Sequence, residues 1–302
     1  MIRVGVDLGG TKIEAIALGP EGRTLSRRRV ATPASDYDAI LRAVVDLVAA
    51  IEQEAGGRGM IGVGTPGAIS PQTHLVKNSN TVVLIGRPLA HDLALALNRV
   101  VRLENDANCF ALSEAVDGAG AHARVVFGVI LGTGVGGGIV IEGKLLKGHN
   151  RIAGEWGHNS LPRQRADEYP GPRCYCGETG CIETFLSGPA LERDFRARGG
   201  AKASGAEIAA LAEEGQVKAL ATLSLYQDRL ARALASVVNI IDPDVIVLGG
   251  GVSNIARLYE GLEPLVERYA FTDALATKIL RNVHGDSGGV RGAAWLWGAG
   301  EG

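Results

Sequence analysis

The chain has 302 residues, 46% of them hydrophobic, which is enough for two domains of ordinary size with a core in each. Its formal net charge is −2 and its pI is about 6.3, so it has no basic surface for nucleic acid or an anionic membrane. The run Arg27-Arg28-Arg29 is interpreted as a solvated face. The longest apolar stretch, residues 125–141, is interrupted by six glycines and a threonine, and no signal-peptide core begins the chain. We therefore expect a cytoplasmic globular protein that binds small molecules.

The first half of the chain starts with a predicted β-hairpin. An apolar run at residues 2–8 enters the turn Gly9-Gly10-Thr11-Lys12, and an alternating run at residues 13–18 leaves it. Asp36 begins a helix with one apolar side, which Gly56-Gly57 ends. The remaining patterns predict strands at residues 25–30, 60–64 and 100–103 and helices at residues 36–54, 89–98 and 107–116.

The pattern of the first hairpin is repeated after Gly118. A strand at residues 125–131 enters a glycine turn at 132–137, and a return strand follows at 138–141. We therefore predict an N-terminal α/β domain at residues 1–117 and a larger α/β domain at residues 118–289. Later patterns predict helices at 189–197, 206–214, 217–241, 254–269 and 290–297 and a strand at 245–248.

The densest chemistry lies at residues 154–183, which contain three of the four cysteines. A histidine and three thiols form a complete tetrahedral ligand set for zinc: His158, Cys174, Cys176 and Cys181. Four protein ligands leave no open position, so residues 158–181 predict a structural zinc motif. A disulfide is the alternative, but a single residue between Cys174 and Cys176 is too short for ordinary bridge geometry.

Two glycine turns are candidates for binding phosphate. Gly132, Gly134 and Gly137 match the G-x-G-x-x-G pattern of dinucleotide-binding proteins, but a short strand follows them where a Rossmann fold has a helix. What remains is two hairpin tips, one in each half of the chain. Their backbone N–H groups and the hydroxyls of Thr11 and Thr133 are suited to a polyphosphate. The alternative is that each tip only closes its hairpin.

Three further positions lie at the ends of predicted strands. Asp7 is placed to hold hydrated Mg²⁺ beside phosphates, with a turn-stabilising role as the alternative. Gly249-Gly250-Gly251 permits close approach of a flat ring such as adenine, although a plain strand-to-helix turn also explains these glycines. Asp106 has the position of a helix N-cap, and Asn105-Asp106 also lies where α/β proteins bind ligands.

Together these motifs resemble the ROK (repressor, open reading frame, kinase) family of sugar kinases, which has the actin-like (ribonuclease H-like) ATPase fold. The matching segments span nearly the whole chain: residues 7–12, 66–67, 105–106, 131–137, 155–158, 174–183 and 249–251. Within the family, the segments most similar to the bacterial fructokinase/mannokinase branch are residues 187–188, 239–244 and 284–297.

The resemblance implies two similar α/β domains around a cleft, with residues 290–302 packed back on the first domain. It assigns Asp106 as the general base that takes the proton of the sugar hydroxyl. It gives His158 one ring nitrogen on zinc and the other toward the sugar. The implied sugar-binding residues are Gly67, Asn80, Asn105, Asp106, Glu155, His158 and Glu183. Those implied for ATP and Mg²⁺ are Asp7, Gly9, Gly10, Thr11, Lys12, Gly132, Thr133, Gly134, Gly249, Gly250, Gly251 and Asn254.

The predicted function is an ATP-dependent hexose 6-kinase with D-fructose as substrate. Glucokinase, mannokinase and N-acetylhexosamine kinase activities are the alternatives within the family. A sugar-sensing repressor is a distant alternative, because such members carry a helix-turn-helix segment before the first strand, and here that strand starts at Ile2. A non-catalytic, zinc-stabilised sugar-binding module is another.

The predicted cofactors and partners are those of a sugar kinase. We expect ATP, Mg²⁺ and structural Zn²⁺ as cofactors, and a homodimer without nucleic-acid or membrane partners. Residues 159–173 separate His158 from Cys174 and contain three prolines, Pro162, Pro170 and Pro172. We expect this excursion to form part of the sugar pocket or a dimer contact.

Overall fold

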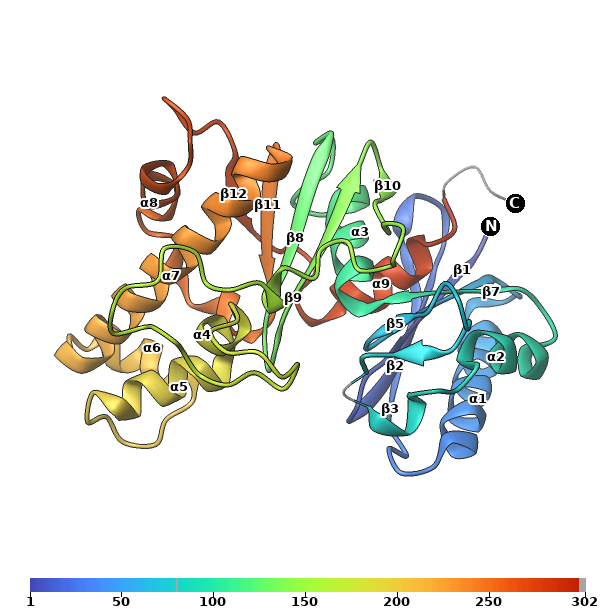
Figure 1. Cartoon of the computed structure of the whole chain (residues 1–302). Coiled ribbons are helices and arrows are strands. Elements are labelled where there is room, and N and C mark those ends of the chain that lie inside the picture. Colours follow the sequence, from blue (N-terminus) through green and yellow to red (C-terminus); the bar gives the residue numbers. More distant parts are fainter. Residues whose placement is uncertain (80, 299–302) are drawn as a thin grey trace. The chain divides into compact units, whose positions relative to one another are not determined.

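The structure is a computed structural model that describes residues 1–79 and 81–298 (Figure 1). The chain divides into two compact units. Unit 1 comprises Met1–His122, Gly138–Ala153 and Val283–Gly302, and unit 2 comprises Ala123–Gly137 and Gly154–Asn282. The domain limits proposed from the sequence stay a prediction, and residues 138–153 group here with the first unit.

Unit 1 is built on a five-stranded sheet that begins with the predicted hairpin. The order is β3-β2-β1-β4-β7, in which the first three strands are antiparallel and β4 and β7 run parallel to β1. Parallel neighbours require crossover connections, and helices α1 and α2 supply them. The bounds are β1 (Arg3–Leu8), β2 (Lys12–Leu18), β3 (Thr24–Ala31), α1 (Tyr37–Ala55), β4 (Met60–Thr65), α2 (Leu89–Leu97) and β7 (Val101–Asn105).

The two faces of β1 carry different side chains because neighbouring residues of a strand point to opposite faces. Val4, Val6 and Leu8 are fully buried in one cluster with the apolar side of α1. The helix starts where the sequence predicts: the Asp36 side chain accepts a hydrogen bond from the Ala39 N–H at 3.0 Å. At its other end Gly56 has a φ of 78°, which favours glycine and ends the helix.

The opposite face of β1 receives α9 (Gly288–Trp295) (Figure 1). A side chain at Gly5 of β1 would collide with the carbonyl oxygen of Val290, and one at Gly62 of β4 with that of Ala293. Two glycines on neighbouring strands therefore let the backbone of a helix lie directly on the sheet. A side chain at Gly292 would likewise collide with Cys109 of α3 (Asp106–Asp117).

The edge strand β3 carries the arginine run, whose exposed side chains pair with glutamates. Arg27 and Arg29 both pair with Glu14 of β2, and Glu14 is only 1% exposed. Arg28 pairs with Glu54 of α1. Paired charges on an edge strand also discourage pairing with another chain. The prediction of a solvated face holds, because all three arginines are exposed, and the structure adds an acidic partner for each of them.

The second sheet has the order β10-β9-β8-β11-β12 and repeats the hairpin-plus-parallel arrangement of the first. Its strands are β8 (Val125–Leu131), β9 (Val135–Ile141), β10 (Lys144–Leu145), β11 (Val245–Gly249) and β12 (Lys278–Arg281). The helices of unit 2 are α4 (Glu183–Leu186), α5 (Gly188–Ala197), α6 (Gly205–Glu213), α7 (Val217–Ile241) and α8 (Leu262–Tyr269). Among the described residues, none of the helices is both long and apolar enough to span a bilayer.

Some local predictions fail. The helix predicted at 254–269 is broken into two 3-10 turns, η4 (Gly251–Asn254) and η5 (Ala256–Tyr259), before α8 begins. Extended backbone at Ile255 and a left-handed Gly261, with a φ of 70°, interrupt it. The sequence also gave no signal for β12 or for the small hairpin of β5 (Ala68–Ile69) and β6 (Val76–Lys77). The remaining 3-10 turns are η1 (Pro20–Gly22), η2 (Val82–Leu84), η3 (Trp156–His158) and η6 (Gly285–Ser287).

Candidate functional site

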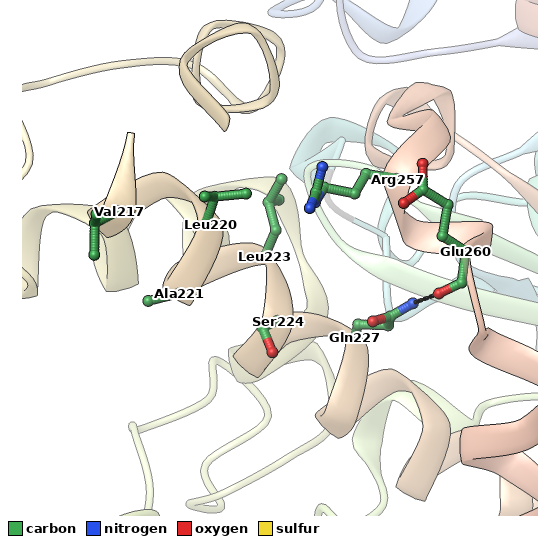
Figure 2. Close-up of a pocket in the computed structure, with 8 residues that line it drawn as sticks. All are labelled: Val217, Leu220, Ala221, Leu223, Ser224, Gln227, Arg257 and Glu260. Carbon is green, nitrogen blue, oxygen red and sulfur yellow. Dashed lines mark hydrogen bonds between the residues drawn. The ribbon is translucent and has the colours of Figure 1, made fainter. Parts of the chain in front are cut away.

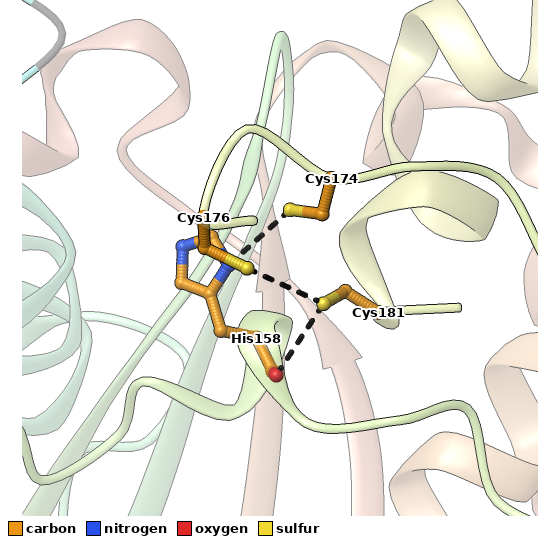
Figure 3. A group of neighbouring side chains, drawn as sticks. All are labelled: His158, Cys174, Cys176 and Cys181. Carbon is orange, nitrogen blue, oxygen red and sulfur yellow. Dashed lines mark hydrogen bonds between the residues drawn. The ribbon is translucent and has the colours of Figure 1, made fainter. Parts of the chain in front are cut away.

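The predicted zinc ligands converge in unit 2. The ligand atoms of His158, Cys174, Cys176 and Cys181 all lie within 4.8 Å of one another (Figure 3). The sulfurs of Cys176 and Cys181 are 3.7 Å apart, and the Cys174 sulfur lies 3.6 Å from Nδ1 of His158. A tetrahedral zinc with Zn–S bonds of about 2.3 Å and Zn–N bonds of about 2.0 Å has edges of roughly 3.5 to 3.8 Å. The four residues therefore fit a four-coordinate zinc ion, and the cysteines are free thiols, not a disulfide.

The cysteines are brought together by a tight loop. The Cys174 N–H donates to the Glu178 carbonyl at 2.8 Å, and Arg173 and Thr179 form an isolated antiparallel bridge. Gly177 and Gly180 have φ values of 102° and 73°, a region that side chains disfavour. These glycines therefore allow the chain to reverse between the second and third thiol.

The second ring nitrogen of His158 has a partner that sequence reasoning missed. Nε2 lies 2.9 Å from the hydroxyl of Tyr175, and the two rings meet edge to face with centroids 5.1 Å apart. Desolvation and the nearby carboxylates of Glu183 and Glu155 raise the pKa of Tyr175 to about 12. The phenol therefore stays protonated at neutral pH.

The segment with the zinc ligands is also attached to the second glycine tip. Glu183, the first residue of α4, accepts a hydrogen bond from the Val135 N–H at 2.9 Å through Oε2. A Cβ atom at Gly134 would lie 2.6 Å from the same oxygen, so only glycine leaves room for the carboxylate. The buried Trp156 donates from its indole to the Gly136 carbonyl at 3.0 Å. One Glu183 oxygen is thus held by the loop, and its predicted contact with sugar stays a prediction.

In unit 1, Asn105 is the helix cap that the sequence assigned to Asp106. Its Oδ1 accepts from the N–H groups of Ala107 and Asn108 at 2.9 and 3.2 Å, and its Nδ2 donates to the Gly67 carbonyl at 3.0 Å. Asp106 is the first residue of α3, and its Oδ1 accepts from the Ala107 N–H at 2.8 Å. The cap assignment is therefore wrong by one residue, although Asn105 and Asp106 both accept hydrogen bonds at the start of the helix.

Asp7 lies near Asp106 within unit 1. Burial raises the pKa of Asp7 to about 7, and the negative charges of Asp106 and Glu14 act in the same direction. Two interacting carboxylates, one enclosed at the end of β1 and one at the start of α3, form a site that favours a cation. Carboxylate oxygens are suited to Mg²⁺, so these residues fit the predicted ion.

The other predicted ligand loops have ordered turns. At the first tip, the Gly9 N–H donates to the Lys12 carbonyl at 3.0 Å, and the Thr32 hydroxyl donates to the Gly9 carbonyl at 2.7 Å. In unit 2, Gly250 has a φ of 83° and passes so close to β8 that a Cβ atom would lie 2.5 Å from the Leu131 carbonyl oxygen. Asn254 accepts from Arg281 at 2.6 Å. Asn80 lies outside the described residues.

A pocket of about 550 Å³ also opens in unit 2 beside α7 (Figure 2). No residue that the sequence assigns to a site lines it. The lining residues are Val217, Leu220, Ala221, Leu223, Ser224, Gln227, Arg257 and Glu260.

Two five-stranded sheets, each with an antiparallel hairpin joined to parallel strands, define the actin-like class of α/β fold. The sequence matches the profile of the ROK family over residues 3–299, and the chain belongs to this family.

Relatives and solved structures agree with this assignment. The chain is 42% identical over 297 residues to an N-acetyl-D-glucosamine kinase of Escherichia fergusonii, covering 97% of this chain and 98% of the relative. It is 42% identical over 296 residues to one of Salmonella paratyphi C, with the same coverage of each chain. The crystal structure of a ROK hexokinase from Thermus thermophilus is similar with a TM-score of 0.86, 36% identity and 97% coverage of both chains. A ROK family glucokinase from Streptomyces griseus, in complex with glucose and AMPPNP, has a TM-score of 0.80, 29% identity and coverage of 98% and 99%.

Proposed function

We propose that the protein is an ATP-dependent sugar kinase that phosphorylates the 6-hydroxyl of N-acetyl-D-glucosamine. The observation that carries the kinase assignment is the Asn105-Asp106 turn in a chain of this family. Asn105 caps the helix and holds Gly67, and it fixes the start of α3, from which the Asp106 carboxylate projects as the proposed base. The relatives named N-acetyl-D-glucosamine kinase, 42% identical over 97% of the chain, support the choice of sugar.

This choice differs from the first prediction from sequence, which was D-fructose. The relatives support one of the stated alternatives, an N-acetylhexosamine kinase, and give fructose no specific support. The fructokinase prediction rested on three segments that contain none of the implied sugar-binding residues, namely residues 187–188, 239–244 and 284–297. They therefore predict the class of reaction better than the identity of the sugar.

Asp106 performs the proton transfer in this proposal. Its carboxylate takes the proton of the 6-hydroxyl as the sugar oxygen attacks the γ-phosphorus and the bond to the departing ADP oxygen breaks. Phosphoryl transfer depends on positioning and charge neutralisation, so one well-placed carboxylate suffices as base. Asp106 stands at the N-terminus of α3, where the helix dipole favours a negative charge.

The remaining predicted residues bind and orient the substrates. Asp7 would hold Mg²⁺, which neutralises phosphate charge when it is bound. The backbone of the tips at residues 9–12 and 132–134 would bind phosphates, and residues 249–251 with Asn254 would contact adenosine. Gly67, Asn105, Glu155, His158 and Glu183 would contact the sugar. Zinc would be held by His158 and the three cysteines in a purely structural role, fixing the segment that carries these side chains.

A substrate panel tests this proposal. Purified protein is assayed with ATP and Mg²⁺ for ADP release in the presence of N-acetyl-D-glucosamine, N-acetylmannosamine, glucose, mannose or fructose. We expect the highest kcat/KM with N-acetyl-D-glucosamine. Preference for another sugar would refute the substrate assignment, and absence of turnover with every sugar would refute the kinase. NMR of the product identifies the phosphorylated oxygen, and any oxygen other than O6 would refute the proposed site of phosphorylation.

A further inference from the structure

We infer that Tyr175 sets the affinity for sugar by competing with it for the outer nitrogen of His158. The inference rests on the proposed function, which assigns that nitrogen to a sugar oxygen. Its physical basis is the single hydrogen bond that joins the Tyr175 hydroxyl to Nε2 at 2.9 Å.

The arrangement of the imidazole fixes which nitrogen is available. Nδ1 faces the thiols and lies 3.6 Å from the Cys174 sulfur, so a metal held by the four ligands occupies the Nδ1 side of the ring. A neutral histidine that ligates through Nδ1 carries its proton on Nε2. Nε2 is then a donor with one hydrogen, and the Tyr175 oxygen, 2.9 Å away, is placed to accept it.

A donor with one hydrogen makes one good hydrogen bond at a time. A sugar oxygen that accepts from Nε2 must take the place that the phenol oxygen occupies in the sugar-free protein. Tyr175 thus acts as an internal substitute for the substrate. It keeps the polar nitrogen satisfied and the ring oriented until a sugar arrives. The observed affinity is lowered by the fraction of molecules in which Tyr175 holds this place.

The surroundings of Tyr175 allow its side chain to move away from His158. The residue is 77% exposed, although its ring meets the imidazole edge to face. Its backbone is held by the flanking ligands Cys174 and Cys176, so the side chain is able to swing aside without moving the loop. Exposed side chains change rotamer on a timescale of nanoseconds, so the exchange does not limit turnover.

The experiment is Tyr175→Phe, which removes the competing oxygen and retains the ring. The dissociation constant for N-acetyl-D-glucosamine is measured by calorimetry without nucleotide, and KM and kcat are measured with ATP. We expect about three- to tenfold tighter sugar binding, the range that one net hydrogen bond accounts for. KM should fall by a similar factor, and kcat should stay within about twofold.

Tyr169→Phe is the matched control, because Tyr169 is 75% exposed and lies on the same segment. It should leave the sugar affinity unchanged. Zinc content and melting temperature are measured for both variants. Unchanged or weaker sugar binding by Tyr175→Phe, in a protein that keeps its zinc, overturns the inference alone. Loss of zinc from this variant also overturns it, since that result gives Tyr175 a structural role. If the wild-type protein binds no hexose, the proposed function fails and the inference fails with it.

Discussion

Glu168 and Arg232 form a buried, two-pronged ion pair. Oε1 of Glu168 lies 2.8 Å from Nη2 of Arg232, Oε2 lies 2.9 Å from Nη1, and Arg229 adds a third contact at 2.8 Å. Both arginines belong to α7, whereas Glu168 belongs to the excursion between His158 and Cys174. Buried salt bridges therefore hold residues 159–173 against α7. Whether these residues also contact sugar or a second subunit stays a prediction.

The first prediction concerns this pair. Glu168→Gln removes the carboxylate that the two buried guanidinium groups share, so that, of the carboxylates, Arg229 keeps only Asp194 and Arg232 only Asp228. We expect this to cost about 3 kcal/mol and to lower the melting temperature at pH 7 by about 6 °C. The neighbouring residue Asp167 is exposed and provides a control. Asp167→Asn removes one negative charge, as Glu168→Gln does, but it removes that charge from the surface. Thermal unfolding measures both, and equal melting temperatures for the two variants would show that the pair does not stabilise the fold.

The pH dependence of this effect has a defined direction. Burial alone would raise the pKa of Glu168, but hydrogen bonds from Arg232, the Arg165 N–H and Arg229 outweigh burial and lower it to about 2. A carboxyl group with a lowered pKa stabilises the fold above its unfolded value, and this contribution is lost as the pH falls toward the folded value. The difference between wild type and Glu168→Gln should therefore shrink as the pH falls from about 4.5 to 2.

The second prediction concerns the general base. Asp106→Asn should lower kcat by about 10²- to 10⁴-fold, because the sugar hydroxyl loses its proton acceptor. The melting temperature should change little, since Asn105 caps α3. The change in KM for sugar should be much smaller than the change in kcat. Steady-state kinetics and circular dichroism measure these quantities, and turnover within tenfold of wild type would exclude Asp106 as the base.

The third prediction concerns Asp7. Its raised pKa of about 7 means that the folded protein without Mg²⁺ disfavours the charged form, so the group lowers stability as the pH rises from about 4 to 7. Asp7→Asn should therefore melt at a higher temperature than wild type at pH 8 in EDTA, and the two should converge below pH 4. With saturating Mg²⁺ and nucleotide the order should reverse, because only wild type gains a ligand for the cation.

The same carboxyl group predicts an effect on activity. Since Mg²⁺ binds the deprotonated form, the apparent Mg²⁺ affinity of wild type should fall as the pH is lowered below about 7. Proton release on Mg²⁺ binding, measured in weakly buffered solution at pH 7, provides an independent check. An Asp7→Asn variant that retains wild-type Mg²⁺ dependence would remove Asp7 from the cation site.

The fourth prediction concerns the metal. We expect about one zinc per chain by elemental analysis, and Cys176→Ser should lower both the zinc content and the affinity for sugar. Cys109 is the natural control, because it is buried in α3 and belongs to no ligand cluster found among the described residues. Cys109→Ala should keep its zinc. Full sugar affinity in metal-free protein would contradict a positioning role for the ion.

The sequence predicted most of what depends on neighbouring residues. The helix start at Asp36, the glycine-tipped hairpins and the cysteine cluster follow from local pattern, spacing and side-chain chemistry, and the structure confirms them. ROK family membership is confirmed as well. The domain limits, homodimer, cytoplasmic location and residue roles in binding ATP and sugar stay predictions.

What the sequence did not predict depends on distant partners. The salt bridge of Glu168 requires Arg232, which lies 64 residues later in the chain. The Tyr175 hydrogen bond depends on the side to which the imidazole turns. The cap at Asn105 was assigned one residue too late, because Asn and Asp are both good N-caps and no local rule chooses between adjacent candidates. The preferred sugar is not readable from motifs that all hexose kinases of the family need.

The glycines that let α9 lie on β1 and β4 also order the events of folding. Arg3 of β1 donates to the carbonyl of Trp297, 294 residues away, and the backbone of Gly5 faces Val290. During synthesis, one face of β1 therefore stays exposed until α9, almost three hundred residues later, has left the ribosome. Contacts of such high sequence separation form slowly and leave apolar surface exposed in the meantime. A chain that stalls before Gly288 keeps its first sheet open to aggregation.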